Sequence, residues 1–339
     1  MKLPVISTLI PTYQRPVMLE RAVKSVLSQT YPHLRVCVFD NCSNDETENV
    51  IKRIQRNDSR VYYHCHGKNI GAGANFIYAL GTVETEYFTF LSDDDFLLPS
   101  FFETAVRQAM NNPEVGFVSL GCRIERDGKL IRPSSIAKII KGYHEPPKAL
   151  TFLLSHWSIL TWTSIMFNKT VLEKVGFPLQ EPCICNDLEF LLRVAASHPV
   201  IILEEEGAVF TDHQTSITSQ SQLKYVWPCY PQVINCIIET YDLPPDICQE
   251  IKRLLNVRFQ KRLAFCFLSA LFRNEWDEAQ KALNIFKTCG SKHHFLALYS
   301  LMSVSGLFPR LIHPLLSLFM RKKHYIVHLM DKLQSSESC

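Results

Sequence analysis

Phe90-Leu91-Ser92-Asp93-Asp94-Asp95-Phe96-Leu97-Leu98-Pro99 places three consecutive carboxylates directly after an apolar segment. The preceding run, Tyr87–Leu91, is short and apolar enough to indicate a buried strand. Like charges about 4 Å apart repel by roughly 4 kcal/mol at an effective dielectric near 20. Such a cluster is stable if water solvates it or if a divalent cation bridges it. Oxygen ligands suit Mg²⁺ or Mn²⁺, and both ions bind nucleotide phosphates.

The alternative for this stretch is a solvated acidic turn in which Asp95 or Ser100 only caps the next helix. Its place after a strand favours the metal site, because open α/β sheets bind ligands at the carboxyl ends of their strands. Ser100 and Glu103 also form the pattern of a capping box, as do Ser43 and Glu46.

Strand and helix patterns alternate on both sides of this stretch. Apolar strands are expected at Val5–Ile10, Val36–Phe39 and Val61–His64, and each is followed by residues with helical spacing. Further on, the expected strands are Val115–Gly121, Ser164–Phe167, Val200–Leu203 and Ala208–Phe210, with helices from Lys169 to Gly176 and over Asp187–Ser197. The polar segment 133–147 is expected to be a loop. The pattern predicts an α/β fold with a largely parallel sheet that carries helices on its faces.

Composition narrows the class of protein. The chain has 339 residues, of which 47% are hydrophobic and 20% charged, as in a globular protein. The net charge of +3 is too balanced to indicate a nucleic-acid partner. The 12 cysteines are scattered, many of them in apolar runs, and the N-terminus has no secretory pattern. We therefore expect reduced thiols in a cytoplasmic protein.

Polar residues also end the first two strands. Asp40 and Asn41 follow the second strand, and their carboxylate and amide groups are suited to hydrogen bonds with a base edge. The alternative is an ordinary strand–turn–helix connection, which does not explain Asp40. The first strand ends in Pro11-Thr12-Tyr13-Gln14-Arg15, which brings a hydroxyl, an aromatic ring and a cation to the same edge.

Together these motifs resemble the inverting family 2 glycosyltransferases. The resemblance implies the GT-A fold of nucleotide-diphospho-sugar transferases, an α/β fold with a Rossmann-like mixed sheet and helices on both faces. Five motifs occur in the family's order within the first 100 residues, and the similarity continues more weakly to about residue 220. They are Pro11-Thr12-Tyr13-Gln14, Ser25-Val26-Leu27-Ser28-Gln29-Thr30, Asp40–Thr47, Asn69-Ile70-Gly71 to Asn75, and the DXD-type loop Ser92–Asp95. Ser92, Asn41 and Gln14 depart from the residues that are frequent in the family.

The resemblance implies a role for each matching residue. The donor-binding residues would be Pro11, Thr12, Tyr13, Asp40, Asn41, Asn69 and Asp93. Asp94 would ligate Mn²⁺ or Mg²⁺, and His213 matches a family position near the metal or the diphosphate, although a lone surface histidine is the alternative. The implied activity is transfer of a sugar from a nucleoside diphosphate, with UDP expected, to a hydroxyl of a saccharide or lipid-linked acceptor in surface polysaccharide or glycoconjugate synthesis.

An acceptor-side candidate lies in Asn186-Asp187-Leu188-Glu189-Phe190-Leu191-Leu192-Arg193, which resembles the family's E-D-x-E/D-x-x-x-R segment. Inverting transfer needs a base for the acceptor proton, and Asp187 would be that base. The alternative is that Asp187 only caps its helix. Glu189 is expected to pair with Arg193 at i+4. Trp162 could stack on an acceptor sugar, although packing in the core is expected. Neither His64-Cys65-His66 nor Cys183-Ile184-Cys185 has the spacing of a zinc site.

The expected domains are a GT-A catalytic domain over 1–220, with a nucleotide-sugar-binding half 1–110 and an acceptor half 111–220, and a helical region over 221–339. Leu296–Met320 is apolar but interrupted by prolines, and Arg321-Lys322-Lys323 follows it. The sequence allows helices packed on the catalytic domain or on a second subunit as a homo-oligomer, and alternatively peripheral contact with the inner face of the membrane.

Two other classes of function compete with the transferase. A catalytically silent nucleotide-sugar-binding or scaffold protein has the same fold, but Asp93, Asp94 and Asp187 argue against it. A nucleotidyltransferase usually carries a glycine-rich, basic phosphate loop near its first strand, and Pro11–Pro16 contains no glycine.

Overall fold

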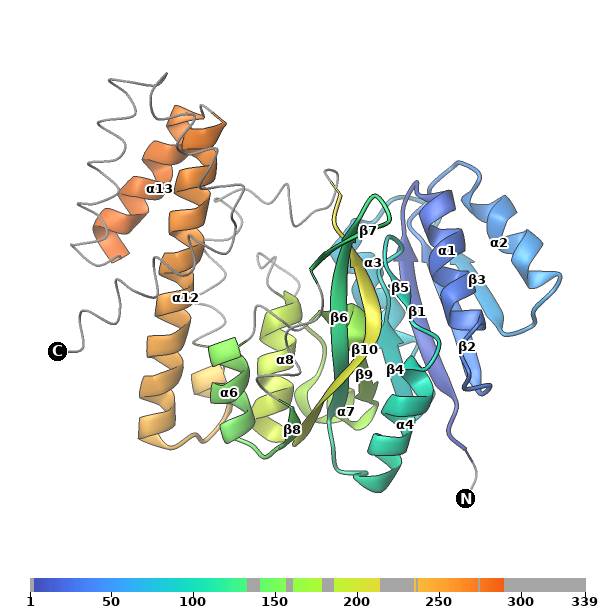
Figure 1. Cartoon of the computed structure of the whole chain (residues 1–339), viewed down its shortest axis with the longest axis horizontal. Helices are drawn as coiled ribbons and strands as arrows, with labels where there is room; N and C mark the ends of the chain where they lie inside the picture. The colour runs from blue at the N-terminus through green and yellow to red at the C-terminus, as the bar shows by residue number, and fades with distance from the viewer. Residues whose placement is uncertain are drawn as a thin grey trace. The chain divides into compact units, whose positions relative to one another are not determined.

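The computed structural model describes residues 3–132, 141–156, 161–178, 186–213, 235, 237–273 and 275–289. The chain divides into two compact units. The first unit comprises Met1–Gln220 with Asn235–Cys248, and the second comprises Ser221–Ile234 with Gln249–Cys339. Figure 1 shows the strands from β1 to β10 in colours that run from blue to yellow.

Four parallel strands form one half of the sheet in the first unit, in the order β3-β2-β1-β4. They are β1 (Ile6–Thr12), β2 (Leu34–Asp40), β3 (Val61–Cys65) and β4 (Tyr87–Phe90). Each is connected to the next by a helix, because parallel strands need a crossover connection. Their carboxyl ends therefore lie along the same edge of the sheet.

The other half of the sheet is mixed. β9 (Ile165–Asn168) runs antiparallel to both β4 and β6 (Phe117–Arg126), and β10 (Val200–Thr211) runs parallel to β6. The short strands β5 (Phe96–Leu97), β7 (Lys129–Arg132) and β8 (Gly142–His144) pair with β10, β6 and β10. The predicted mixed α/β sheet is confirmed.

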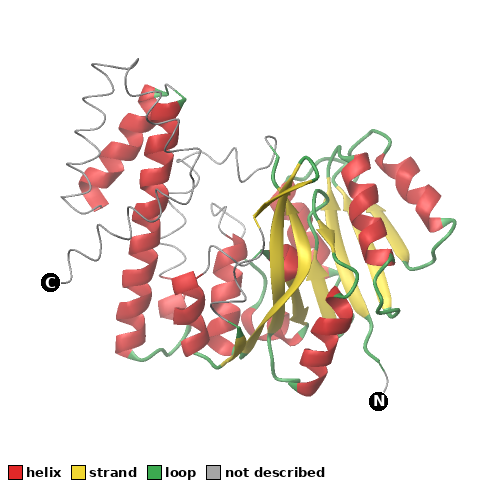
Figure 2. Cartoon of the chain, in the orientation of Figure 1, coloured by secondary structure: helices red, strands yellow, loops and turns green. Residues whose placement is uncertain are grey.

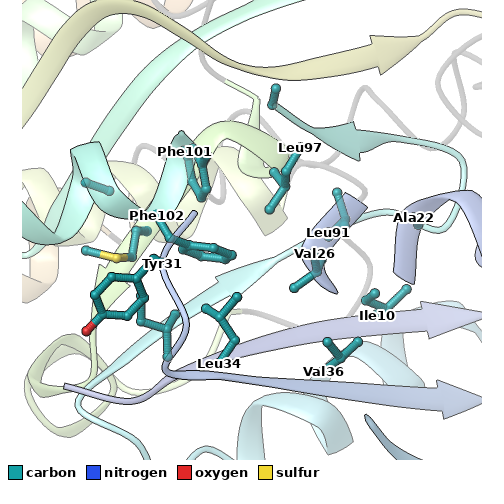
Figure 3. Packing of buried hydrophobic residues seen from close by; sticks show 14 of the residues in the cluster. Ile10, Ala22, Val26, Tyr31, Leu34, Val36, Leu91, Leu97, Phe101 and Phe102 are labelled. Atoms are coloured by element: carbon teal, nitrogen blue, oxygen red, sulfur yellow. The ribbon is translucent and has the colours of Figure 1, made fainter. Parts of the chain in front are cut away.

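Helices cover both faces of the sheet (Figure 2). One face packs against α1 (Pro16–Leu27), α2 (Thr47–Gln55) and α4 (Phe101–Asn111), and the core there includes Ile10, Val26 and Phe102 (Figure 3). The opposite face carries α3 (Ala72–Gly81) and α8 (Asn186–Ser197), with α6 (Lys148–His156) and α7 (Thr170–Val175) against α8. On that face Phe76 of α3 and Phe190 of α8 both contact the Trp162 ring.

The two predicted capping boxes are wrong. Helix α2 begins at Thr47 after Glu46, without a side-chain cap, because the Ser43 hydroxyl instead donates to Asp40. Helix α4 also lacks a side-chain cap, and Glu103 accepts a hydrogen bond from the Thr30 hydroxyl instead. In both cases the side chain expected to cap the helix forms a hydrogen bond with a residue outside that helix instead.

Two predicted boundaries also differ. Val200–Leu203 and Ala208–Phe210 belong to one strand, β10, whose register with β6 is irregular between Ile202 and Ala208. The segment 133–147, expected to be a loop, contains strand β8 in its described part, while residues 133–140 lie outside the described residues.

Two helices make up most of the described C-terminal region, α12 (Pro245–Phe272) and α13 (Trp276–Cys289). They bury apolar side chains such as Phe267 and Phe286. Over the residues that the structure describes, no helix has the length and apolar character needed to span a membrane. Leu296–Met320 and Arg321-Lys322-Lys323 lie outside those residues.

Candidate active site

The loop that follows β4 lies beside the end of β1. Thr12 pairs with Asp40 in the parallel register of β1 and β2, and the Leu91 amide donates to the Leu9 carbonyl at 3.0 Å. The chain therefore carries Asp93 from the end of β4 to the end of β1. There the Thr12 hydroxyl donates to Oδ2 of Asp93 at 2.7 Å.

Asp93 is almost completely buried, with 6% of its surface exposed. Burial raises the pKa of its carboxyl above the usual range, while the Thr12 hydrogen bond and the Arg15 charge act in the opposite direction. Nη1 of Arg15 lies 3.1 Å from Oδ1 of Asp93. Both oxygens of this carboxylate thus have a partner within the protein.

Asp94 brings together two segments that are distant in sequence. Its Oδ2 lies 2.9 Å from Nη1 of Arg15 and 2.8 Å from Nε2 of His213. Thr211 ends β10, and this places His213 two residues beyond the strand, next to the acidic loop. The structure therefore brings together Asp93, Asp94 and His213 from the predicted set.

The pair Asp94–His213 fits one edge of a divalent metal site. A carboxylate oxygen and an imidazole nitrogen are ligands for Mn²⁺, and neighbouring ligands of an octahedral ion lie about 3 Å apart. The observed separation of 2.8 Å is that of a direct hydrogen bond between the two side chains and is also close to this ligand spacing. Among the described residues, no group of three or more His, Cys, Asp or Glu side chains is placed to hold a metal. Phosphate oxygens would have to complete the coordination, as they do when Mg²⁺ binds nucleotides.

Asp95 is buried and hydrogen-bonded within the protein, which the sequence does not indicate. Only 1% of it is exposed; Oδ1 accepts from the Thr211 amide at 2.8 Å and Oδ2 from the Thr163 hydroxyl at 2.6 Å. Burial, reinforced by the charge of Asp94, raises the pKa of Asp95 to about 7. Asp95 thereby ties the acidic loop to the end of β10 and to the 3₁₀ helix η2 (Trp162–Ser164).

The residues predicted to contact the base form a second cluster on the other side of Thr12. Nδ2 of Asn41 donates to Oδ1 of Asn69 at 2.9 Å, and the Asn41 amide donates to the Thr12 carbonyl at 3.0 Å. Asp40 is 2% exposed and accepts from Ser43 at 2.6 Å and from Tyr63 at 2.6 Å. Asp40 is therefore a buried member of this cluster and holds Ser43 and Tyr63 by hydrogen bonds.

The end of β1 contributes an exposed side chain next to this cluster. Tyr13 is 41% exposed, whereas Pro11 is half-buried and Thr12 is 3% exposed. Tyr13 is thus an exposed aromatic residue of the predicted donor-binding set, and an exposed ring offers a face for stacking on a base.

Asp187 lies in the first turn of α8. The Leu188 amide donates to Oδ1 of Asp187 at 2.7 Å, and the Trp162 indole donates to its carbonyl at 3.1 Å. The side chain is exposed to solvent, yet surrounding protein desolvates it enough to raise the pKa of the carboxyl. Since Trp162 precedes Thr163, the partner of Asp95, a short chain of contacts connects Asp187 to the acidic loop.

Several expectations about non-catalytic residues are confirmed. Glu189 is fully buried and pairs with Arg193, as the i+4 spacing predicts. Trp162 is half-buried and packs among aromatic rings, His64 stacks on the Tyr78 ring, and His66 contacts that ring edge-on. Cys183-Ile184-Cys185 lies outside the described residues.

Replacing Arg193 with alanine is expected to destabilise the first unit by about 3–5 kcal/mol, because the substitution breaks the buried ion pair with Glu189. Arg193 also donates to the carbonyls of Val175 and Phe177. Urea unfolding followed by circular dichroism measures the change. The control, Arg253→Ala, removes an exposed pair with Glu250 and is expected to cost less than about 1 kcal/mol. Equal effects of the two variants would contradict the assignment.

Sequence reasoning gave no role to three residues that complete the acidic loop. From the sequence, Arg15 is only a cation at the end of the first strand. Arg21 donates to the Asp94 carbonyl and, at 2.9 Å, to the Thr211 hydroxyl, while its guanidinium lies 4.7 Å from the Phe96 ring centroid. Thr163 could not be found either, because a lone threonine before a strand carries no pattern. Arg15, directly before α1, and Arg21, within α1, both contact the acidic loop.

Known proteins resemble this chain in both sequence and fold. The family model for glycosyl transferase family 2 matches residues 7–176, half of the chain. A GalNAc(5)-diNAcBac-PP-undecaprenol beta-1,3-glucosyltransferase of Campylobacter jejuni is 31% identical over 176 residues, which are 52% of this chain and 55% of that protein. The chain is thus matched to about half the length of this relative.

Solved structures share the fold. TarS 1-349 of S. aureus in complex with UDP-GlcNAc superposes with a TM-score of 0.63 at 17% identity, covering 86% of this chain and 82% of that one. The mannosyltransferase PcManGT of Pyrobaculum calidifontis, in complex with GDP-Man and Mn²⁺, gives a TM-score of 0.57 at 17% identity, covering 93% and 85%. The fold expected from the resemblance, GT-A, is confirmed. By its sequence match and its fold, the chain belongs to glycosyl transferase family 2.

Proposed function

We propose that this glycosyltransferase moves a sugar from a nucleoside diphosphate donor to an acceptor hydroxyl with inversion at the anomeric carbon. The observation that carries the proposal is the contact between Nε2 of His213 and Oδ2 of Asp94. These atoms lie 2.8 Å apart, beside the ends of β1 and β4. Asp93 and Thr12 adjoin this pair and would face the ribose and phosphates. Tyr13, with Pro11, Asp40, Asn41 and Asn69 behind it, would form the base subsite.

A bound Mn²⁺ or Mg²⁺ would offset the negative charge that builds on the departing diphosphate. Asp94 and His213 would hold it from one side. Asp187 would accept the proton of the acceptor hydroxyl while that oxygen forms its bond to the anomeric carbon. The bond to the diphosphate breaks on the opposite side, and the electron pair leaves with the phosphate oxygen. A single displacement of this kind inverts the configuration.

The raised pKa of Asp187 supports its role as the base. A carboxylate whose pKa lies closer to neutral holds the transferred proton better than an ordinary surface aspartate. Its exposed side chain gives an acceptor access to the oxygen that does not bond Leu188. Burial of Glu189 in its pair with Arg193 leaves Asp187 as the available carboxylate in this turn of α8.

We infer a UDP-sugar as donor and a saccharide or lipid-linked acceptor in surface polysaccharide or glycoconjugate synthesis. The complex of TarS with UDP-GlcNAc supports the first, and the undecaprenol-linked name of the Campylobacter relative supports the second. The GDP-Man complex of PcManGT makes GDP the competing nucleotide.

We further propose that residues 1–220 form the catalytic domain, with 1–110 binding the donor and 111–220 the acceptor. The helical region 221–339 would pack on that domain or on a second subunit, or would contact the inner face of the membrane. A lipid-linked acceptor favours a cytoplasmic enzyme with peripheral membrane contact.

A panel of UDP, GDP, CDP and dTDP tests the donor assignment. With Mn²⁺ present, UDP is expected to raise the melting temperature most, because a ligand that binds only the folded state stabilises it. Each nucleotide is measured again with EDTA, which is expected to remove most of the shift. A larger shift with GDP would reassign the donor, and shifts that EDTA leaves unchanged would contradict the metal site.

A further inference from the structure

One guanidinium nitrogen bridges the two carboxylates of the acidic loop. Nη1 of Arg15 lies 3.1 Å from Oδ1 of Asp93 and 2.9 Å from Oδ2 of Asp94. The Arg15 side chain is 29% exposed, whereas those of Asp93 and Asp94 are 8% and 14% exposed. A single positive group thus occupies the position where two poorly solvated anions meet, and its charge offsets their mutual repulsion.

The oxygen that Arg15 holds is the same one that faces His213. Oδ2 of Asp94 accepts from Nη1 of Arg15 and lies 2.8 Å from Nε2 of His213. In the proposed function, this Asp94–His213 edge is where a divalent ion would bind. Arg15 and the ion therefore compete for Asp94, since two cations sharing one carboxylate oxygen repel each other.

The backbone fixes the position from which Arg15 reaches the loop. Gln14 adopts a positive φ of 55° and is held there because its amide donates to the Ser43 hydroxyl at 2.8 Å. Pro16 begins α1 and restricts the backbone of Arg15, whose carbonyl accepts the first helical bond from Leu19 at 3.0 Å. The side chain, in contrast, is long and partly exposed. Its head can turn to a nearby anion without any change in the backbone.

We propose that Arg15 is an exchangeable counterion of the metal site. In the empty enzyme it neutralises Asp93 and Asp94 and weakens the binding of a divalent ion alone. When the donor enters, Arg15 turns from Asp94 to the diphosphate, for which its guanidinium is suited. The ion and the nucleotide then bind cooperatively, because each favours the arrangement that the other needs. This inference rests on the proposed function and adds a positioning role for Arg15.

Binding of Mn²⁺ alone, followed by electron paramagnetic resonance of the free ion, tests the proposal without any turnover. Arg15→Gln is expected to tighten Mn²⁺ binding on the order of tenfold, the scale of an ordinary coupling between sites. The factor by which UDP tightens Mn²⁺ binding is expected to fall by a similar amount. Arg15→Lys, which keeps the charge, should stay near the wild type.

Lys24→Gln is the matched control. It removes one positive charge from the same helix, where Lys24 pairs with Glu20 and is 65% exposed. Mn²⁺ binding in this variant is expected to match the wild type, and circular dichroism confirms that each variant is folded. If Arg15→Gln binds Mn²⁺ no more tightly than Lys24→Gln does, the counterion role is wrong.

Asp94→Asn separates this failure from failure of the proposed function. If it loses Mn²⁺ binding while Arg15→Gln behaves like the wild type, the metal site stands and only the role of Arg15 falls. If Asp94→Asn binds Mn²⁺ as the wild type does, with and without UDP, the metal is elsewhere and both proposals are contradicted.

Discussion

Asp94→Asn is expected to lose Mn²⁺-dependent binding of the nucleotide and, with it, sugar transfer. The substitution removes the charge of the oxygen that meets both Arg15 and His213. A metal ion contributes several kcal/mol of charge stabilisation in such sites, so transfer should fall by about a thousandfold or more. Isothermal calorimetry with UDP and Mn²⁺ measures the binding, and a donor-turnover assay measures the transfer.

The fold should survive this change, because the carboxylate that anchors the loop is Asp95 rather than Asp94. Glu84→Gln serves as the control. This residue precedes β4, at the sheet edge opposite the strand ends, and its side chain is 84% exposed. Its variant should bind UDP as the wild type does. If Asp94→Asn bound UDP with Mn²⁺ at wild-type affinity, the assignment of Asp94 would be refuted.

Asp187→Asn is expected to lower kcat by about 10²–10⁴, which is the usual contribution of a positioned general base. Binding of UDP with Mn²⁺ should remain unchanged, since Asp187 connects to the acidic loop only indirectly among the described residues, through Trp162 and Thr163. Asparagine keeps the size of the side chain and an oxygen that can accept from the Leu188 amide. The helix start is therefore preserved.

Transfer kinetics combined with calorimetry separate the two effects. Glu173→Gln, an exposed change in the first turn of α7, is the control and should leave both quantities at wild-type values. Unchanged kcat in Asp187→Asn would remove Asp187 from the role of base. A loss of UDP affinity equal to the loss in kcat would instead place it in the donor site.

Much of the first unit was predictable because its strands are short, apolar and buried, and because its helices carry one apolar stripe. In α1 the apolar residues at positions i, i+3, i+4 and i+7, which are Leu19, Ala22, Val23 and Val26, are the buried set. The strand ends were predictable for the same reason: polar residues interrupt apolar runs at Asp40 and at Ser92–Asp95. Parallel strands then bring such ends to one edge of the sheet.

The connections between these ends could not be predicted, because they depend on tertiary contacts. Ser43 has the local pattern of a cap, but Asp40 and the Gln14 amide lie nearer in the fold. Arg15 and Thr163 reach acids 78 and 68 residues away along the chain. The resemblance to the family supplied the positions of Asp94 and His213, and only the structure showed that one oxygen of Asp94 meets both Arg15 and His213.

The anomalous scattering of manganese in crystals grown with UDP and Mn²⁺ tests the central assignment most directly. A peak is expected within about 2.3 Å of both Oδ2 of Asp94 and Nε2 of His213, with the UDP phosphates on its open side. A peak located elsewhere, or UDP bound at these strand ends with no manganese next to Asp94, would contradict the account.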